Sequence, residues 1–205
     1  MRGHGARPFE VSGAVHLQPA LVARLWHEGL RGQGQAVTAL RLENFAKSVR
    51  LSQGQAERAC SRPTARSTSS TRENSLALLG RAAPALGAAG QRCAALAHLD
   101  HRRRRGPKVV AAISAYMECR AFYDWSGGLV WAEVLPTTDA GAADVRRVIA
   151  THGGHATLIR AEPQVRAAVE VFQPLEAGLE QLSRKLKAAF DPAGILNPGR
   201  MYANL

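Results

Sequence analysis

The chain has 205 residues, of which 46% are hydrophobic, and a formal net charge of +11. This length accommodates one ordinary domain with its own core. No apolar run approaches the roughly 18 to 20 residues of a membrane span, and the first residues lack the apolar stretch of a secretory signal. We therefore expect a cytoplasmic protein with no segment inserted in a membrane.

The cysteine pattern argues against a metal centre. Cys60, Cys93 and Cys119 show no Cys-x-x-Cys spacing. An odd number without that spacing speaks against a disulfide framework, a zinc site or an iron–sulfur cluster within the chain. We predict no metal site and interpret the three as buried or incidental thiols.

The positive charge is unevenly distributed. Residues 1–50 carry 7 basic and 3 acidic side chains, residues 51–106 carry 10 and 3, and residues 107–205 carry 10 and 10. The basic run at residues 102–105 has no interleaved aromatic side chains on which bases would stack. Despite the net charge, we expect no nucleic-acid partner.

The first 50 residues predict a strand, a helix and a second strand. Strand patterns cover residues 9–17 and 37–43, and Pro19 suits the first turn of a helix over residues 19–29. Residues 51–106 differ, because most of them are rich in Arg, Ala, Ser, Gly and Pro and show neither helical nor strand periodicity. We interpret that segment as divergent, basic and poorly ordered. Compensated frameshifts explain it, with a natural basic insertion or a disordered linker as the alternatives.

Residues 107–159 predict, in chain order, a short helix, two strands, a helix and a third strand. Pro107 suits the first helical turn, Asp139 caps the second helix and Gly153 ends it. The strands are expected over residues 119–125, 129–134 and 155–159, with a turn at 126–128.

This order is that of a split βαβ unit without its first strand. The missing strand belongs just before Gly106, where residues 93–105 have weak strand character. The predicted fold class is therefore α+β: a ferredoxin-like antiparallel sheet with helices on one face, incomplete because one strand is lost. An unpaired sheet edge should result.

The last thirty residues begin with an amphipathic helix over residues 175–190. Apolar side chains recur every three or four positions and form one stripe, so we expect the helix to dock on a core. The stripe consists of Leu175, Leu179, Leu182, Leu186 and Phe190. Pro192 and Gly194 then stop the helix, and Asn197-Pro198-Gly199 predicts a tight turn.

Two groups of motifs resemble a known family. Residues 190–200, Phe-Asp-Pro-Ala-Gly-Ile-Leu-Asn-Pro-Gly-Arg, resemble the motif that ends the C-terminal cap domain of FAD-linked oxidases of the vanillyl-alcohol oxidase class. Residues 121–131 and 151–158 are similar to the FAD-binding subunit of glycolate oxidase (glycolate dehydrogenase), the GlcE type. The resemblance covers residues 106–202, returns more weakly over residues 8–49 and largely fails between them.

The resemblance implies FAD as the cofactor and places Asn197 beside the flavin, followed by Gly199 and Arg200. A turn that merely ends the chain is the structural alternative. His155 and Tyr123 are weaker candidates for the substrate, the alternatives being an ordinary histidine and a core aromatic residue. The resemblance assigns no catalytic residue.

Arg120 and Arg160 suit a carboxylate substrate, but nothing selects them over ordinary surface arginines. The implied partners are a second FAD-containing glycolate oxidase subunit and an iron–sulfur subunit, through which the protein would lie at the periphery of the inner membrane.

These observations divide the chain into three parts. Residues 1–50 and 107–205 are the expected N- and C-terminal parts of the cap domain, which ends in the Asn-Pro-Gly-Arg motif, and residues 51–106 separate them. Nothing corresponding to the family's N-terminal FAD-binding domain is found. We therefore expect a fragment of an FAD-dependent oxidoreductase subunit that oxidises 2-hydroxy acids (glycolate to glyoxylate) within a multi-subunit complex. The alternative is a non-catalytic ferredoxin-like module that docks on partner subunits.

Overall fold

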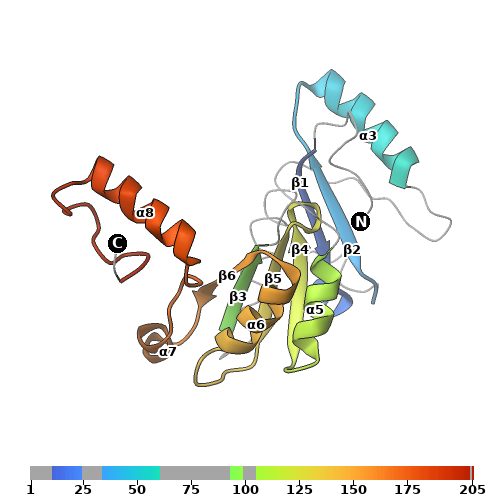
Figure 1. Cartoon of the computed structure of the whole chain (residues 1–205). Helices are drawn as coiled ribbons and strands as arrows, with labels where there is room; N and C mark the ends of the chain where they lie inside the picture. The colour runs from blue at the N-terminus through green and yellow to red at the C-terminus, as the bar shows by residue number, and fades with distance from the viewer. Residues whose placement is uncertain (1–10, 25–33, 61–92, 99–104, 204) are drawn as a thin grey trace.

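The structure is a computed structural model that describes all residues except 1–10, 25–33, 61–92, 99–104 and 204; for residues 59–60 and 93–98 it describes the backbone alone. Six strands form one antiparallel sheet in the order β2-β1-β4-β5-β3-β6 (Figure 1). The strands are β1 Val11–Leu17, β2 Val37–Leu42, β3 Cys93–His98, β4 Cys119–Asp124, β5 Leu129–Val134 and β6 His155–Arg160.

The described helices surround and extend this sheet. They are α1 Pro19–Val22, α3 Ala46–Cys60, α5 Gly106–Ser114, α6 Ala142–His152, α7 Pro163–Ala168 and α8 Ala177–Phe190, with a 3₁₀ turn η2 at Trp125–Gly127 between β4 and β5. The α+β class and the antiparallel sheet predicted from the sequence are confirmed. The expected strands and α6 begin and end within one or two residues of the predictions wherever both ends are described, and α5 begins within one residue of its prediction. The helix expected over residues 19–29 was predicted too long, because α1 ends at Val22 and Ala23 and Arg24 form a turn.

The expectation of a missing strand is wrong. Residues 93–98 form β3, which pairs antiparallel with β5 on one side and with β6 on the other. The order β3-α5-β4-β5-α6-β6 is thus a complete ferredoxin-like unit, with β3 at an interior position of the sheet. A strand paired on both edges is specified by its neighbours more than by its own propensity, which explains why this alanine-rich segment was not predicted. Among the described strands, the sheet edges are β2 and β6.

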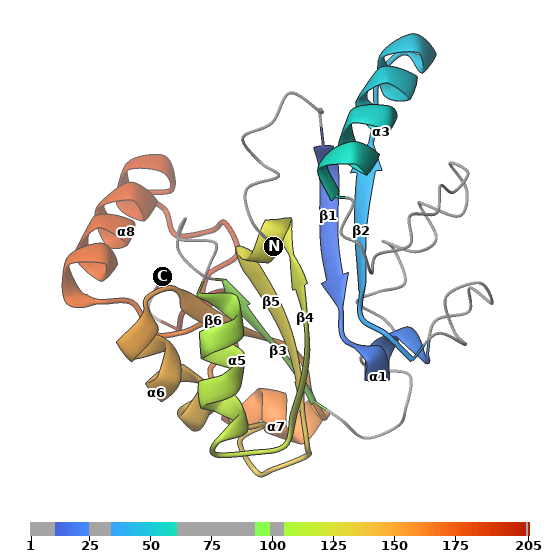
Figure 2. The same cartoon turned by 90° about the vertical axis from the view of Figure 1, so that its right-hand side faces the viewer.

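Helices α5 and α6 pack on one face of this ferredoxin-like unit (Figure 2). Val109 and Ile113 of α5 meet Val145 and Ile149 of α6 over Val130 of the sheet. These side chains are nearly inaccessible to solvent, and burial of that kind is the main source of stability in such a layer. The predicted placement of helices on one face is confirmed for these two.

The opposite face is covered near its centre by α1. Leu21 and Val22 of α1 pack against Leu17 and Phe122, and the Phe122 ring stacks on Trp131 with centroids 5.8 Å apart. Successive residues of a strand point to opposite faces. Phe122 therefore belongs to this second core, whereas its neighbours in sequence belong to the first.

The side chain of Asp139 caps the N-terminus of α6. The N-cap residue is Gly141, in the left-handed region at φ 68°, and the Asp139 carboxylate accepts hydrogen bonds from Gly141 N and Ala143 N, both at 3.0 Å. These bonds hold the pKa of Asp139 below its ordinary value. Asp139 therefore caps the helix with its side chain, as predicted, although it lies two positions before the N-cap residue Gly141.

Helix α3 occupies residues for which no periodicity was predicted. Of its described side chains only Ser52 and Ala56 are buried, and Gln53 donates to Glu57 one turn away at 3.0 Å. Local bonds of this kind support a helix that lacks an extensive apolar face. Residues 61–92, on which much of the frameshift hypothesis depends, lie outside the described residues.

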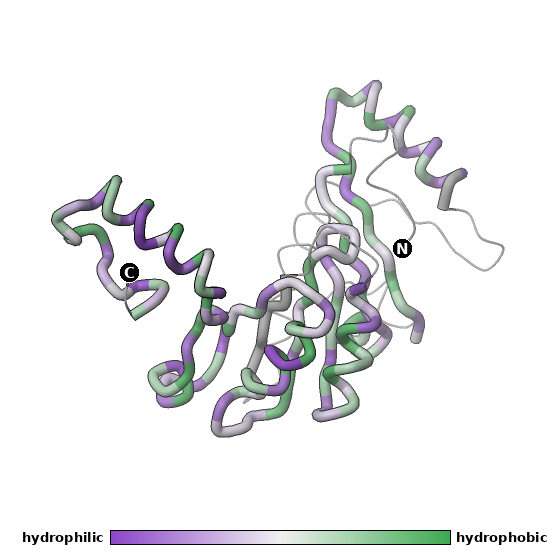
Figure 3. Tube along the Cα trace, viewed as in Figure 1, coloured by the Kyte–Doolittle hydropathy of each residue, from purple (hydrophilic) through white to green (hydrophobic). Residues whose placement is uncertain are grey.

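Helix α8 does not dock on a core of the described chain. None of its residues is buried, and Figure 1 shows it standing apart from the sheet, connected through α7. Its hydrophobic and hydrophilic positions alternate along the ribbon in Figure 3. The amphipathic helix was thus predicted correctly, but the core expected against it is not present among the described residues.

Candidate functional site

The C-terminal tail, residues 191–203, is organised by Asp191. Its carboxylate accepts hydrogen bonds from Ile195 N at 3.0 Å and Leu196 N at 2.9 Å, and it pairs with Lys187 Nζ of α8 at 2.7 Å. The Lys187 ammonium also donates to the Leu196 carbonyl. These contacts hold the pKa of Asp191 below its ordinary value. The predicted stop after α8 is therefore an ordered loop.

The Asn-Pro-Gly-Arg motif forms the predicted turn. Asn197 and Gly199 both lie in the left-handed region, at φ 46° and 67°, and Arg200 N donates to the Asn197 carbonyl at 3.3 Å. Gly199 N donates to a main-chain carboxylate oxygen of Leu205, the last residue, at 2.7 Å. A Cβ at Gly199 would meet nothing closer than 3.9 Å, so the backbone angle, not crowding, requires glycine there.

The residues of this turn are exposed and include two polar side chains. Asn197, Gly199 and Arg200 are all exposed. The amide of Asn197 carries both a donor and an acceptor, and the guanidinium of Arg200 donates only. The exposed glycine leaves backbone open to a close approach. The three residues implied by the family resemblance are thus together and accessible on one turn.

The tail is tied to the edge of the sheet at β6. The Tyr202 ring lies against Phe172, with centroids 5.9 Å apart, and Phe172 bridges Thr157 of β6. Leu158 N also donates to the Val171 carbonyl at 2.8 Å. His155, the first residue of β6, is exposed on this edge. The substrate candidate His155 therefore belongs to the strand that anchors the tail.

Tyr123 lies in the first core. It is only 7% exposed, and a Cβ at Gly106 would come within 3.0 Å of its ring. The ring lies 6.1 Å from that of His16, and burial raises the pKa of its hydroxyl. No contact described in the structure brings Tyr123 together with Asn197 or His155.

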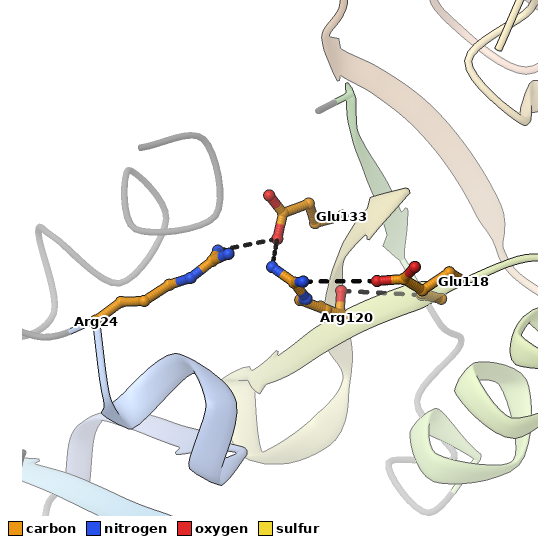
Figure 4. Close-up of polar contacts among 5 residues, drawn as sticks. Arg24, Glu118, Arg120 and Glu133 are labelled. Carbon is orange, nitrogen blue, oxygen red and sulfur yellow. Dashed lines mark hydrogen bonds and ion pairs between the residues drawn. The ribbon is translucent and has the colours of Figure 1, made fainter. Parts of the chain in front are cut away.

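A second polar site lies on the sheet face that α1 covers (Figure 4). Glu133 of β5 is fully buried, and its Oε2 lies 3.2 Å from Arg24, two residues after α1, and 4.0 Å from Arg120 of β4. Arg120 also pairs with the half-exposed Glu118 at 3.5 Å. We call these four residues the Glu133 cluster. The two carboxylates and two guanidinium groups balance in charge, so the cluster carries no net charge.

Sequence reasoning missed Glu133. A charged residue inside the apolar run Leu129–Val134 was the available signal, because a buried carboxylate requires a partner. Among the described residues, its Oε1 has no hydrogen-bond partner, and neither has Nε1 of Trp131 two residues earlier. Arg120, considered for a carboxylate substrate, is engaged by these glutamates. The simplest role of the cluster is to join α1 to the sheet.

The described residues also bear on two other classes of site. No group of three or more His, Cys, Asp or Glu side chains there is arranged to hold a metal ion. In the same part of the chain, no helix has both the length and the apolar character needed to cross a membrane.

Comparisons with known proteins connect the tail to a family. Residues 175–201 match the family described as FAD linked oxidases, C-terminal domain. The chain is also 38% identical over 82 residues to glycolate oxidase subunit GlcE of Escherichia coli (strain K12), and this covers 40% of the chain and 21% of that relative. No solved structure matches the chain significantly. The chain is thus similar over residues 175–201 to the C-terminal domain of FAD linked oxidases, and it spans about a fifth of the length of the glycolate oxidase subunit that it resembles.

Proposed function

We propose that the chain is part of an FAD-dependent oxidoreductase subunit of the glycolate oxidase kind. The observation that carries the proposal is the ordered turn at residues 197–200, whose exposed polar side chains lie within the segment that the family model matches. The proposed reaction is the oxidation of a 2-hydroxy acid, glycolate to glyoxylate. The proposed partners are a second FAD-containing subunit and an iron–sulfur subunit.

In this proposal the turn contacts the flavin. Asn197 offers its amide donor and acceptor to the flavin edge, Gly199 permits close approach of the backbone, and Arg200 offsets negative charge. FAD, when bound, accepts the hydride that leaves the substrate carbon.

The proton from the substrate hydroxyl needs a separate acceptor. His155 is the better candidate of the two proposed substrate residues, because it is exposed on β6 and a neutral imidazole nitrogen can accept a proton. Tyr123, enclosed in the first core, is suited to support the sheet beneath such a site.

The test uses glycolate oxidase assembled with an Escherichia coli GlcE from which the region similar to this chain has been removed. We expect the added chain to restore glycolate-dependent reduction of a dye, and Asn197→Ala to lower the restored rate at least about ten-fold. Asn197→Asp, which keeps the size of the side chain but removes the amide donor, separates hydrogen bonding from turn geometry. A chain that binds the complex without restoring any activity would support the non-catalytic interaction module instead.

A further inference from the structure

Joining α1 to the sheet accounts for only one of the two carboxylate oxygens of Glu133. Its Oε2 pairs with Arg24 at 3.2 Å, whereas Oε1 is buried and has no hydrogen-bond partner among the described residues. Figure 4 shows the first oxygen directed toward the two guanidinium groups and the second directed away from them. Leaving a buried acceptor unpaired costs free energy, so native proteins rarely do so without a reason.

The indole of Trp131 is unpaired in the complementary way. Trp131 and Glu133 are two residues apart on β5, so they share one face of the sheet and lie about 7 Å apart along the strand. Trp131 Nε1 is buried and has no acceptor in the part of the chain that the structure describes. The ring itself is held by its stack on Phe122. An unpaired donor and an unpaired acceptor are thus neighbours on this face.

One kind of chemical group satisfies both atoms. An indole nitrogen only donates, and an ionised carboxylate only accepts. Their common partner has to accept one hydrogen bond and donate another, which a hydroxyl does and a carbonyl or an ammonium does not. With hydrogen bonds of about 3 Å on either side, a single hydroxyl oxygen bridges two neighbouring side chains on a strand. The pair Trp131 and Glu133 is therefore suited to a hydroxyl.

Arg120 provides a guanidinium next to this pair. It lies directly opposite Glu133 in the pairing of β4 with β5. Its ion pairs are long, 3.5 Å to Glu118 and 4.0 Å to Glu133, whereas a hydrogen bond from a guanidinium to a carboxylate measures about 2.7–2.9 Å. Arg24 already neutralises Glu133 at shorter range. Since Arg120 is also partly exposed, its donors remain accessible to a carboxylate that arrives from solvent.

We propose that Trp131 and Glu133 bind the hydroxyl of a 2-hydroxy acid and that Arg120 binds its carboxylate. Such an acid carries the two groups on adjacent carbons, which matches a hydroxyl position beside a guanidinium. The proposal rests on the proposed function for the class of substrate, and it adds the residues that recognise that substrate. Glu133 orients the hydroxyl in this arrangement, and no proton transfer is assigned to it.

The test titrates the full chain with glycolate and follows the indole N–H resonance of Trp131 by nuclear magnetic resonance, with calorimetry for the variants. We expect a saturable shift of that resonance, and acetate, which lacks the hydroxyl, should bind at least about ten-fold more weakly. Trp131→Phe keeps an aromatic ring on Phe122 and changes no charge, and it should weaken glycolate binding at least about ten-fold. The matched control Glu118→Gln removes a competing carboxylate from Arg120 and should bind glycolate at least as tightly.

The proposal is overturned by an indole resonance that glycolate does not shift, by equal affinities for acetate and glycolate, or by a loss in Glu118→Gln as large as that in Trp131→Phe. An indole N–H that exchanges with an ordered water and does not respond to glycolate would assign both unpaired atoms to that water.

The outcomes also separate this site from the proposed function. Saturable glycolate binding by a chain that never restores dye reduction to the truncated GlcE assembly overturns the proposed function and leaves the site standing. Restored dye reduction whose KM for glycolate is the same in Trp131→Phe overturns the site and leaves the proposed function standing.

Discussion

The ferredoxin-like unit and the α8 segment use the same sequence pattern with opposite results. Helix α6 has apolar residues at helical spacing, and Val145, Val148 and Ile149 are buried under α5 and against the sheet. Helix α8 has an equally clear stripe, and none of its residues is buried. Helical periodicity thus identifies which side of a helix seeks an apolar partner, but it does not locate that partner.

The contrast extends to the apolar side chains of the two regions. The apolar side chains on the α5–α6 face of the ferredoxin-like unit pack on one another, and this burial stabilises the unit. In the α8 segment, Asp191 accepts hydrogen bonds from backbone amides of the tail, but the apolar side chains stay exposed. The match to the family model falls on that second region.

The largest expected effect comes from removing equivalent aliphatic side chains in the two regions. Ile149→Ala should lower the free energy of unfolding by about 2–5 kcal/mol, because it opens a cavity in a close-packed core. Leu186→Ala in α8 should change it by less than about 0.5 kcal/mol. Urea unfolding followed by circular dichroism measures both. Equal losses would mean that the chain itself covers the apolar stripe of α8.

A smaller loss is expected at the Glu133 cluster. Glu133→Gln should cost about 1–3 kcal/mol, because it leaves Arg24 and Arg120 beside a buried group that no longer carries their countercharge. The loss stays below that of a fully buried pair, since the two arginine side chains are 23% and 29% exposed.

Glu118→Gln provides the matched comparison on the same arginine. Glu118 is 54% exposed, so its removal should cost less than about 1 kcal/mol. The same unfolding titration applies, and a Glu118 effect as large as that of Glu133 would show that burial does not decide the strength of these pairs.

Two glycines with nearly identical φ angles extend the comparison between the ferredoxin-like unit and the α8 segment. Gly141 has φ 68° and a Cβ there would lie 2.9 Å from Met117 Sδ, whereas Gly199 has φ 67° and open surroundings. Gly141→Ala should destabilise the ferredoxin-like unit by about 2 kcal/mol, most of it backbone strain. Gly199→Ala should perturb only the amide resonances of the tail. A fall in global stability with Gly199→Ala would mean that the tail contributes to folding.

Much of the fold could be predicted from the sequence because local signals were strong. Strands β4, β5 and β6 lie where their composition predicted them, and Pro107, Asp139 and Gly153 mark the helix ends near where they were expected. Strand β3 escaped prediction because interior pairing with β5 and β6 compensates for its weak propensity. The short α7 also went unpredicted.

The candidate site could likewise be predicted only in part from the sequence. The turn at residues 197–200 followed from Pro198 and Gly199, whose conformational limits act locally. The Glu133 cluster did not, because it joins α1, β4 and β5, and such pairings depend on the order of strands in the sheet. A charged residue within an apolar run indicates that a buried charge needs a partner, but it does not identify that partner.

The smallest expected effect is a pH-dependent loosening of the tail that leaves the ferredoxin-like unit unchanged. The pKa of Asp191 in the folded tail lies below its ordinary value of 3.8, chiefly because of Lys187 and the amides that it accepts from. The ordering of the loop is therefore fully present above pH 3.8 and is lost as the pH falls through the lower folded pKa. Amide chemical shifts of Ile195 and Leu196 should follow that titration, while those of β5 should not.

Asp191→Asn is the decisive variant for that titration. An amide of the same size keeps one acceptor oxygen but loses the charge that pairs with Lys187. Ile195 and Leu196 should then show loosened shifts at neutral pH and no titration in the acid range. Shifts that still titrate in Asp191→Asn would assign the loop's order to another acid. Shifts that keep their native values at neutral pH would show that the ends of the loop, not Asp191, hold its shape. Either result would remove the reason for treating Asp191 as the residue that organises the tail, and with it the sharpest distinction between the two regions.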